Sequence, residues 1–261
     1  MLTREDIGRY SRAQGLSLGQ TELDYVHHQL LSLLGRSIKN DWVFKGGTCL
    51  QKVLALDRFS EDLDFTLIGQ PDVQQTVAKI LDSLNLLGLP ARVKWPKSSK
   101  GRNEGTFRVQ VEGPLFDGRD LSRCSVLFNL SQREDLLRTP QVTRTVPSYP
   151  DLQPYLIYHM DPDEMLAEKV RAMLKRDKAR DLYDVGFLLQ KGISLEAGLV
   201  REKLSLYSLK LTKALIREAI SKKEAVWELE LAPLIHGALP SFKSVSKRVH
   251  DALYRLTENG K

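Results

Sequence analysis

Two aspartates, Asp62 and Asp64, stand two residues apart in the segment Asp62–Leu67, where polar and apolar residues alternate as they do in a strand. Side chains two apart in a strand project from the same face, so both carboxylates point the same way. Hard oxygen ligands at this spacing suit Mg²⁺ or Mn²⁺, ions that bind through a few carboxylates, waters and substrate phosphates. Such an ion, held against a nucleoside triphosphate (NTP), would activate an attacking hydroxyl and neutralise the leaving pyrophosphate. The pair therefore predicts catalytic metal ligands.

A glycine pair lies upstream of the aspartates, in the run Lys45-Gly46-Gly47-Thr48. A short strand is expected before it, at residues 42–44, and a helix after it, at residues 48–56. Glycines at the start of a helix let the backbone approach a ligand closely, and the free amides together with the helix dipole favour a phosphate. An isolated Asp-x-Asp is more often the polar face of an edge strand. The glycine turn at this distance shifts the interpretation toward a nucleotide site.

Two other classes of enzyme that handle phosphates use similar letters. Residues 62–66, Asp-Leu-Asp-Phe-Thr, fit the Asp-x-Asp-x-Thr of haloacid-dehalogenase-type phosphatases, but that motif ends a buried apolar strand, whereas residues 57–61 are polar. Glycosyltransferases with Asp-x-Asp place it after a longer nucleotide-sugar fold than the residues ahead of Asp62 could build. Neither class accounts for the Gly-Gly-Thr.

A second block of charged residues starts at Asp161 and has the features of a helix. Asp161 can cap the helix, and Pro162 suits its first turn. If the following run, residues 175–184, is also helical, three carboxylates share one side of it: Asp177, Asp181 and Asp184. On its own, such a charged helix most often carries surface ion pairs.

Together the two blocks resemble known nucleotidyltransferases. The first resembles motif I of the polymerase-β-like superfamily, which has a Gly-Gly or Gly-Ser turn, a short helix and then Asp-x-Asp. The second, residues 164–184, resembles the second half of the AbiEii/AbiGii-type toxin family, a branch of that superfamily. Residues 227–242 also resemble that family's tail, so that the resemblance runs from about residue 42 to residue 253.

This resemblance implies a toxin of a toxin–antitoxin or phage-defence system, with a possible cognate antitoxin. Characterised relatives transfer a nucleotide from an NTP to the 3′ end of tRNA and so block translation. The implied metal ligands are Asp62 and Asp64, Asp184 takes a further catalytic role, and Lys169 acts as a catalytic point charge on a phosphate. The expected nucleotide-binding residues are Lys45, Gly46, Gly47, Thr48, Ser60 and Lys169.

One position departs from the superfamily pattern. A third carboxylate would fall on a later strand, within residues 126–131, where this chain offers Asn129. Asparagine can ligate Mg²⁺ weakly but cannot act as a base. The departure leaves open whether Asp184 compensates or transfer is slow.

The distribution of elements predicts an α+β fold in two parts. Residues 1–160 are expected to form a nucleotidyltransferase-like mixed sheet flanked by helices, and residues 161–261 a helical bundle that completes the active-site cleft. The other elements expected in the first part are residues 21–35, 73–87, 91–95, 106–111, 124–130 and 155–159. Residues 96–105 are expected to be a mobile hairpin loop.

The chain is basic, with 39 Lys and Arg against 33 Asp and Glu. Most of the excess lies from residue 162 onward, where 19 basic residues face 14 acidic ones. A basic helical part can attract the phosphates of tRNA or another RNA, although solvated charged helices give the same composition. The candidate RNA-binding residues are Arg171, Arg176 and Arg180.

Composition limits the remaining classes. The apolar runs are shorter than the roughly 20 residues of a membrane helix, and no signal peptide is visible. Two cysteines, Cys49 and Cys124, allow no disulfide framework or cysteine-based zinc site. We therefore expect a cytoplasmic protein without membrane contact; the oligomeric state stays open.

Three hypotheses about function follow. The leading one is transfer of a nucleoside monophosphate (NMP) from an NTP to an RNA 3′ hydroxyl, with tRNA as acceptor. The closest alternative is transfer to a small molecule or a protein hydroxyl. The third is a catalytically degenerate fold that binds RNA or a partner protein, which only Asn129 supports.

Overall fold

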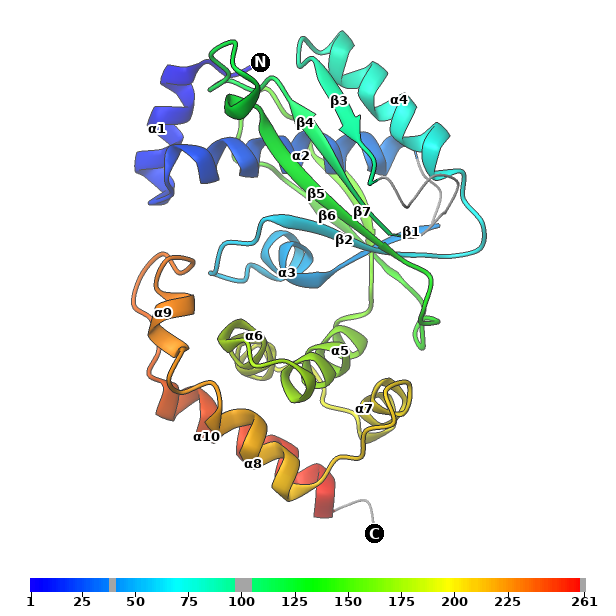
Figure 1. The fold of residues 1–261 in the computed structure, drawn as a ribbon, viewed down its shortest axis with the longest axis vertical. Helices are drawn as coiled ribbons and strands as arrows, with labels where there is room; N and C mark the ends of the chain where they lie inside the picture. The colour runs from blue at the N-terminus through cyan, green and yellow to red at the C-terminus, as the bar shows by residue number, and fades with distance from the viewer. Residues whose placement is uncertain (38–40, 97–104, 259–261) are drawn as a thin grey trace. The chain divides into compact units, whose positions relative to one another are not determined.

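The computed structural model describes residues 1–37, 41–96 and 105–258, and it divides into two compact units (Figure 1). The sheet unit consists of Met1–Ala55, Phe59–Leu136 and Pro140–Met160. The helical unit consists of Leu56–Arg58, Leu137–Thr139 and Asp161–Lys261. The hairpin loop expected at residues 96–105 lies, apart from its two end residues, outside the described residues.

The strands of the described residues form one mixed sheet in the order β3-β4-β5-β2-β1-β7-β6. Their bounds are β1 Trp42–Lys45, β2 Asp62–Leu67, β3 Ala91–Lys94, β4 Gly105–Val111, β5 Cys124–Ser131, β6 Gln141–Thr145 and β7 Tyr155–His159. β2 runs parallel to β5, and β1 runs parallel to β7, while the other neighbours are antiparallel. A mixed sheet with helices confirms the expected fold class, and the strand with the two aspartates is central in it.

One face of the sheet is apolar and carries a row of aromatic rings. Phe65 of β2 lies between Phe44 of β1 and Phe128 of β5, with ring centroids 5.2 and 6.1 Å away. Asp62 and Asp64 occupy the alternate positions of β2, and both are half-buried. Burying each ring stabilises the fold by about 2 kcal/mol. A slip of one residue would turn the rings out and the carboxylates in, so this burial fixes the register of β2.

In the described part of the sheet unit the helices are α1 Arg4–Gln14, α2 Leu18–Ser37, α3 Gly46–Leu54 and α4 Val73–Leu86. A short 3₁₀ turn, Asp120–Ser122, precedes β5. α2 crosses the sheet against β5 and β7, and α4 packs on α2 and β3 (Figure 1). α3 packs on β1 and β2, the two strands on either side of it in the chain.

Polar side chains of α2 are buried together with Lys52 of α3. The Lys52 ammonium pairs with the Asp24 carboxylate and lies 3.2 Å from Nε2 of His28. Burial opposes ionisation of Asp24, but Lys52 outweighs it and lowers the pKa of this carboxyl to about 2. Burial, and then the nearby Lys52, lower the pKa of His27 and of His28 to about 3. Both imidazoles are therefore neutral at physiological pH.

The protein is expected to lose stability as the pH falls from 7 to 5. In this window the unfolded chain protonates both His27 and His28, whereas the folded chain does not, so the unfolded state binds more protons. The stability from keeping each imidazole neutral is fully present above about pH 6.5 and is lost as the pH falls toward 3; the loss reaches about 2 kcal/mol per histidine at pH 5. Urea unfolding at both pH values measures it. His27→Gln and His28→Gln should each remove about half of the pH dependence, and an unchanged slope in both would contradict this assignment.

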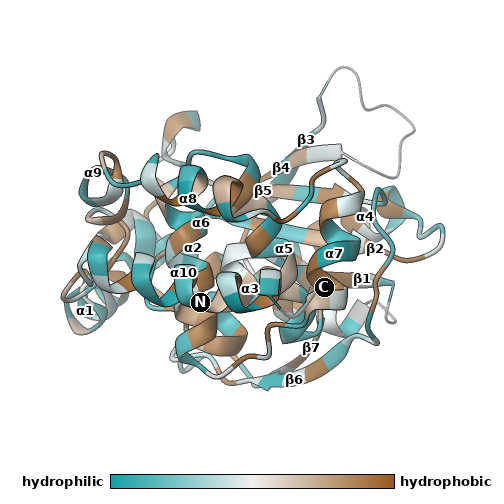
Figure 2. Cartoon of the chain, turned by 90° about the horizontal axis from the view of Figure 1, so that it is seen from below, coloured by the Kyte–Doolittle hydropathy of each residue, from teal (hydrophilic) through white to brown (hydrophobic). Residues whose placement is uncertain are grey.

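The helical unit contains α5 Pro162–Lys175, α6 Ala179–Gln190, α7 Ala197–Ser205, α8 Lys213–Ser221, α9 Trp227–Leu231 and α10 Phe242–Glu258. Hydrophilic and hydrophobic residues are interspersed along these helices, as expected for elements that bury one side (Figure 2). None of the helices in the described part of the chain is both long and apolar enough to span a membrane.

A buried carboxylate holds one of the two short segments of the helical unit. Glu164 of α5 accepts hydrogen bonds from the backbone N–H of Leu137 at 3.0 Å and of Arg138 at 2.9 Å. Its second partner is the Lys203 ammonium of α7, 2.6 Å away. Glu164, which the sequence marks only as a favourable first-turn residue, thus fastens the segment Leu137–Thr139 to α5.

Candidate active site

Three polar side chains stand side by side on neighbouring strands of the sheet. In the register of the strands, Asp64 of β2 is opposite Lys45 of β1 and opposite Asn129 of β5. The amide nitrogen of Asn129 donates to Oδ1 of Asp64 at 2.9 Å. Asn129 therefore lies directly beside the second aspartate, where the sequence analysis expected the departure from a third carboxylate.

Gly46 lies in close contact with the Asp64 carboxylate. Its backbone has a φ of +78°, a conformation that L side chains rarely adopt. A Cβ atom on Gly46 would lie 2.1 Å from Oδ2 of Asp64 and 2.9 Å from its Cβ. The first glycine of the pair thus allows a close approach between the start of α3 and the carboxylate.

Replacing Gly46 by alanine is expected to abolish activity, because the added methyl group must displace the Asp64 carboxylate. Gly69→Ala is the matched control, since Gly69 has a φ of +67° and nothing within 4 Å of its added Cβ. Both variants should lose about 1 kcal/mol of stability from the left-handed backbone, but only Gly46→Ala should lose the nucleotide transfer that the sequence predicts, by about a hundredfold or more, because it displaces the expected metal ligand Asp64. Urea unfolding and transfer assays on both variants provide the comparison; equal activity in the two would show that the close contact is dispensable.

The first turn of α3 begins beside Asp64, at the end of β1. Lys45 is the N-cap residue, and no side-chain hydrogen bond caps this end within the described residues. Uncapped amides and the helix dipole make such an end favourable for a phosphate. Gly46, Gly47 and Thr48 are the first three residues of the helix.

Thr48 and His27 hold the backbone at the start of β2. The buried Thr48 hydroxyl donates to the carbonyl of Asp62, so its side chain fixes the start of β2 and is not available to a phosphate. His27 Nε2–H donates to the carbonyl of Glu61 at 3.0 Å. Sequence reasoning missed His27, because its partner is 34 residues away. Ser60 lies half-buried in the connection just before these residues.

The side chains at this edge fit a hard divalent cation. Asp62 and Asp64 are half-buried neighbours on one face of β2, and the Asn129 amide adjoins them. No group of three or more His, Cys, Asp or Glu side chains that could hold a metal occurs among the described residues. A site with two carboxylates suits Mg²⁺, which keeps several waters and completes its shell with substrate phosphates.

The second block of the sequence builds a buried ion-pair cluster inside the helical unit. Asp184 of α6 is fully buried, and Arg58 donates to both of its oxygens, at 2.6 Å from Nε and 2.7 Å from Nη2. The Lys169 ammonium of α5 lies 2.6 Å from Oδ2 of Asp184. Burial opposes ionisation of Asp184, but Arg58 and then Lys169 outweigh it and lower the pKa of this carboxyl to about 2. Two cations around one carboxylate leave a net positive charge.

These contacts bear on the role expected for Asp184. Both of its oxygens are engaged and none of its surface is exposed, so its environment is that of a structural anion. Lys169 keeps a partly exposed side chain, as a phosphate contact requires. Arg58 stands in a polar loop, where an arginine is ordinarily exposed, and its partner lies 126 residues further on.

The arginines proposed for RNA lie in different surroundings in the helical unit. Arg176, just after α5, pairs with Asp181 at 2.9 Å. The Arg171 guanidinium lies over the ring of Tyr207, 4.7 Å from its centroid. Arg180, in the first turn of α6, is exposed. They do not share one set of contacts.

Comparisons with known proteins identify a family and similar folds. The family described as "Nucleotidyl transferase AbiEii toxin, Type IV TA system" matches residues 32–252. Among solved structures, MenT4, a nucleotidyltransferase toxin from Mycobacterium tuberculosis H37Rv, has a TM-score of 0.70 at 21% identity, over 99% of this chain and 90% of that one. JHP933 from Helicobacter pylori has a TM-score of 0.60 at 16% identity, over 94% of each chain.

The search of curated proteins finds no match. At these identities the two solved structures show a common fold, whereas the family match spans most of the chain and includes both sequence blocks. The chain belongs to the AbiEii nucleotidyltransferase toxin family of type IV toxin–antitoxin systems.

Proposed function

We propose that this toxin transfers an NMP from an NTP to the 3′ hydroxyl of an RNA, with tRNA as the acceptor, and thereby blocks translation in the cytoplasm. The observation that carries the proposal is the edge of the sheet at Asp64. There, two carboxylates share one face of β2, and Gly46 brings the uncapped start of α3 against the second of them. This combination suits a metal–triphosphate complex.

The reaction forms a bond between the acceptor oxygen and the α-phosphorus and breaks the bond to pyrophosphate. Bound Mg²⁺ or Mn²⁺, held by Asp62 and Asp64, would supply charge neutralisation for this exchange. The amides of Gly46, Gly47 and Thr48 would bind phosphate oxygens. These amides and the ammonium of Lys45 then orient the triphosphate. The carboxylates of β2 or water take up the acceptor's proton, because an asparagine at position 129 cannot.

Lys169 is proposed to contact a phosphate as a point charge. Asp184 then acts as a positioning residue, since it is buried and holds the Lys169 ammonium at 2.6 Å. Arg58 keeps Asp184 ionised and in place, so that the ammonium of Lys169 is fixed rather than mobile.

RNA as the acceptor is supported by the basic excess of the chain from residue 162 onward. Arg171, Arg176 and Arg180 are candidates for contacts with its phosphates. A cognate antitoxin is the expected partner in a family of this type. One alternative is a small-molecule or protein hydroxyl as the acceptor. The other is a protein that binds RNA or a partner without transfer, and Asn129 beside Asp64 favours it.

The test is to incubate the purified protein with total tRNA, Mg²⁺ or Mn²⁺, and each labelled NTP in turn, beside Asp62→Ala. Label on tRNA only with the intact protein is the expected result, and it identifies the nucleotide. Label on the protein itself or on a small molecule would move the proposal to another acceptor. Measurable NTP binding without transfer to any acceptor would support the binding-only alternative.

A further inference from the structure

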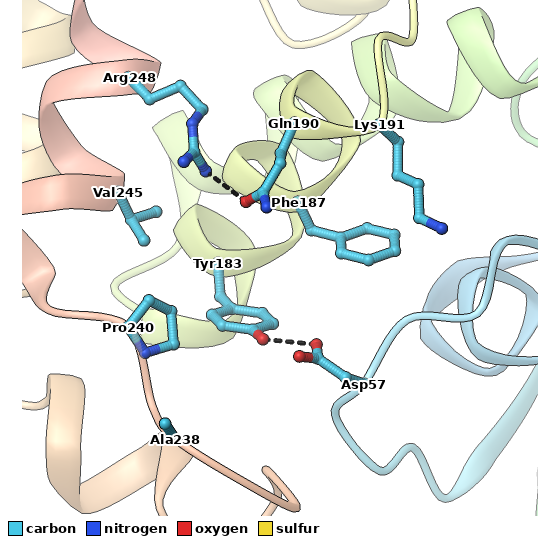
Figure 3. Close-up of a pocket in the computed structure, with 9 residues that line it drawn as sticks. All are labelled: Asp57, Tyr183, Phe187, Gln190, Lys191, Ala238, Pro240, Val245 and Arg248. Atoms are coloured by element: carbon cyan, nitrogen blue, oxygen red, sulfur yellow. Dashed lines mark hydrogen bonds between the residues drawn. The ribbon is translucent and has the colours of Figure 1, made fainter.

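A cavity of about 370 Å³ opens between α6 and α10 in the helical unit (Figure 3). None of the residues placed in the catalytic or nucleotide-binding sets lines it. Its wall combines aromatic, proline and charged side chains: Asp57, Tyr183, Phe187, Lys191, Pro240 and Arg248. Cavities of this size and mixed lining are typical of sites for small organic ligands or single ligand groups.

The polar groups of this cavity are held in place by hydrogen bonds. The Tyr183 hydroxyl donates to one carboxylate oxygen of Asp57 at 2.5 Å. Arg248 Nη1 donates to the carbonyl of Gly186 at 3.2 Å and to Oε1 of Gln190 at 2.9 Å. Figure 3 shows the guanidinium reaching from α10 toward α6 and the Phe187 ring projecting from α6 between Gln190 and Lys191. The cavity is therefore preorganised on both sides.

The segment that contributes Pro240 to the lining is also held in place. The indole N–H of Trp227 in α9 donates to the carbonyl of Pro240 at 3.0 Å, which fixes the segment ahead of α10. Asp57 adjoins Arg58, whose guanidinium binds the buried Asp184 through two hydrogen bonds. A ligand between these walls would meet groups that need little reorganisation.

The charge around the cavity favours an anion. Arg248 and Lys191 outnumber the one carboxylate in its lining, that of Asp57. The exposed side chain of Lys243 adds positive charge in the first turn of α10, whereas the Lys247 ammonium is paired with the Asp251 carboxylate at 2.7 Å. Aromatic faces next to a line of cations form the pattern with which proteins bind single-stranded nucleic acid.

We propose that this cavity binds one unpaired nucleotide of the acceptor RNA. The base lies against Phe187 and Tyr183, and the Asp57 carboxylate accepts a hydrogen bond from a base amino group. Arg248 and Lys191 contact the adjoining phosphates. Lys243 of α10 adds a cation beyond the cavity lining, which favours a chain with a further phosphate over a free mononucleotide. This inference rests on the proposed function for the identity of the acceptor.

The test measures RNA binding without turnover. In the Asp62→Ala background, the affinity for a fluorescent single-stranded tetranucleotide containing all four bases is measured at several salt concentrations, with the four free mononucleotides as competitors. Phe187→Leu keeps an apolar side chain but removes the planar face, and should weaken binding by about tenfold with an unchanged salt slope. Arg248→Gln should also weaken binding, and should reduce the slope of log affinity against log salt by about 0.7, the value for one phosphate of a single strand.

Arg217→Gln is the control, because Arg217 is an exposed arginine on α8 in the same unit, outside the cavity lining. The affinity of Arg217→Gln for the tetranucleotide should stay close to that of the parent. Thermal unfolding checks that all variants are folded. Tetranucleotide binding that Phe187→Leu and Arg248→Gln leave unchanged would overturn the inference, as would mononucleotides that bind as tightly as the tetranucleotide. Transfer to tRNA with such unaffected binding would refute the cavity alone. Cavity-dependent RNA binding without transfer would refute the proposed function alone.

Discussion

Asp64→Asn is expected to reduce nucleotide transfer by at least about a thousandfold, because it removes one of the two carboxylates proposed to hold the metal and so several kcal/mol of transition-state stabilisation. The substitution preserves the shape of the side chain next to Gly46 and beside Asn129. Stability should therefore change little, and the loss should lie in the rate. Single-turnover transfer at saturating NTP, with thermal unfolding in parallel, measures both.

Asp82→Asn is the matched control, since Asp82 is an exposed aspartate of α4 in the same unit. It should transfer at the parent rate. A fall in both variants would indicate a general effect of charge. An Asp64→Asn protein that keeps more than about a tenth of the parent rate would show that metal ligation does not depend on this carboxylate, because a lost ligand costs far more than the 1.4 kcal/mol of a tenfold change.

The sheet around the site could largely be predicted from the sequence. Asp62–Leu67 has the bounds of β2 as expected, because its three apolar residues face a buried side and its alternation is regular. Two elements were missed. β6 is an edge strand with only Thr145 buried, so it shows no alternating pattern. α1 has only Ile7 buried, so its apolar periodicity is weak, and its signals are limited to its ends, the Thr3–Asp6 capping box and the C-cap Gly15.

The parts of the candidate site that follow from local sequence patterns were also predicted, whereas those that depend on distant contacts were not. The positions of Asp62, Asp64 and Asn129 on one side of neighbouring strands follow from period-two patterns. Residues 175–184 do not form the one helix on which Asp177, Asp181 and Asp184 would share a side, because α5 ends at Lys175 and α6 begins at Ala179. The break, residues 176–178, is made of charged residues and has no glycine or proline to mark it in the sequence.

Tertiary contacts account for what the sequence could not give. The contact between Gly46 and Asp64 depends on how α3 returns to β2, and the bond from His27 to Glu61 depends on α2 crossing the sheet. Arg58 offers no local signal at all, since an arginine in a polar loop is ordinarily exposed. A single sequence gives no means to pair it with a carboxylate 126 residues away.

Arg58→Met is expected to lower the free energy of unfolding by about 3–5 kcal/mol, because it leaves a fully buried carboxylate without its two-pronged partner. Lys169 alone would remain beside Asp184, so the pKa of that carboxyl should rise from about 2. Urea unfolding at pH 7 measures the loss. Arg119→Met serves as the control, because the Arg119 side chain is 80% exposed and its pair with Asp117 lies at the surface; no measurable change is expected there.

The double variant Arg58→Met with Asp184→Leu tests the cause of that loss. When both partners are replaced by apolar groups, no buried charge is left uncompensated, and most of the lost stability should return. Lys169, whose side chain is 14% exposed, can then turn its ammonium to solvent. If Asp184 acts by holding Lys169, this stable double variant should bind NTP more weakly than the parent. Its KM for NTP should then rise by a larger factor than its kcat falls. If instead kcat collapses at an unchanged KM, Asp184 takes part in the chemical step, and the positioning role proposed for it is wrong.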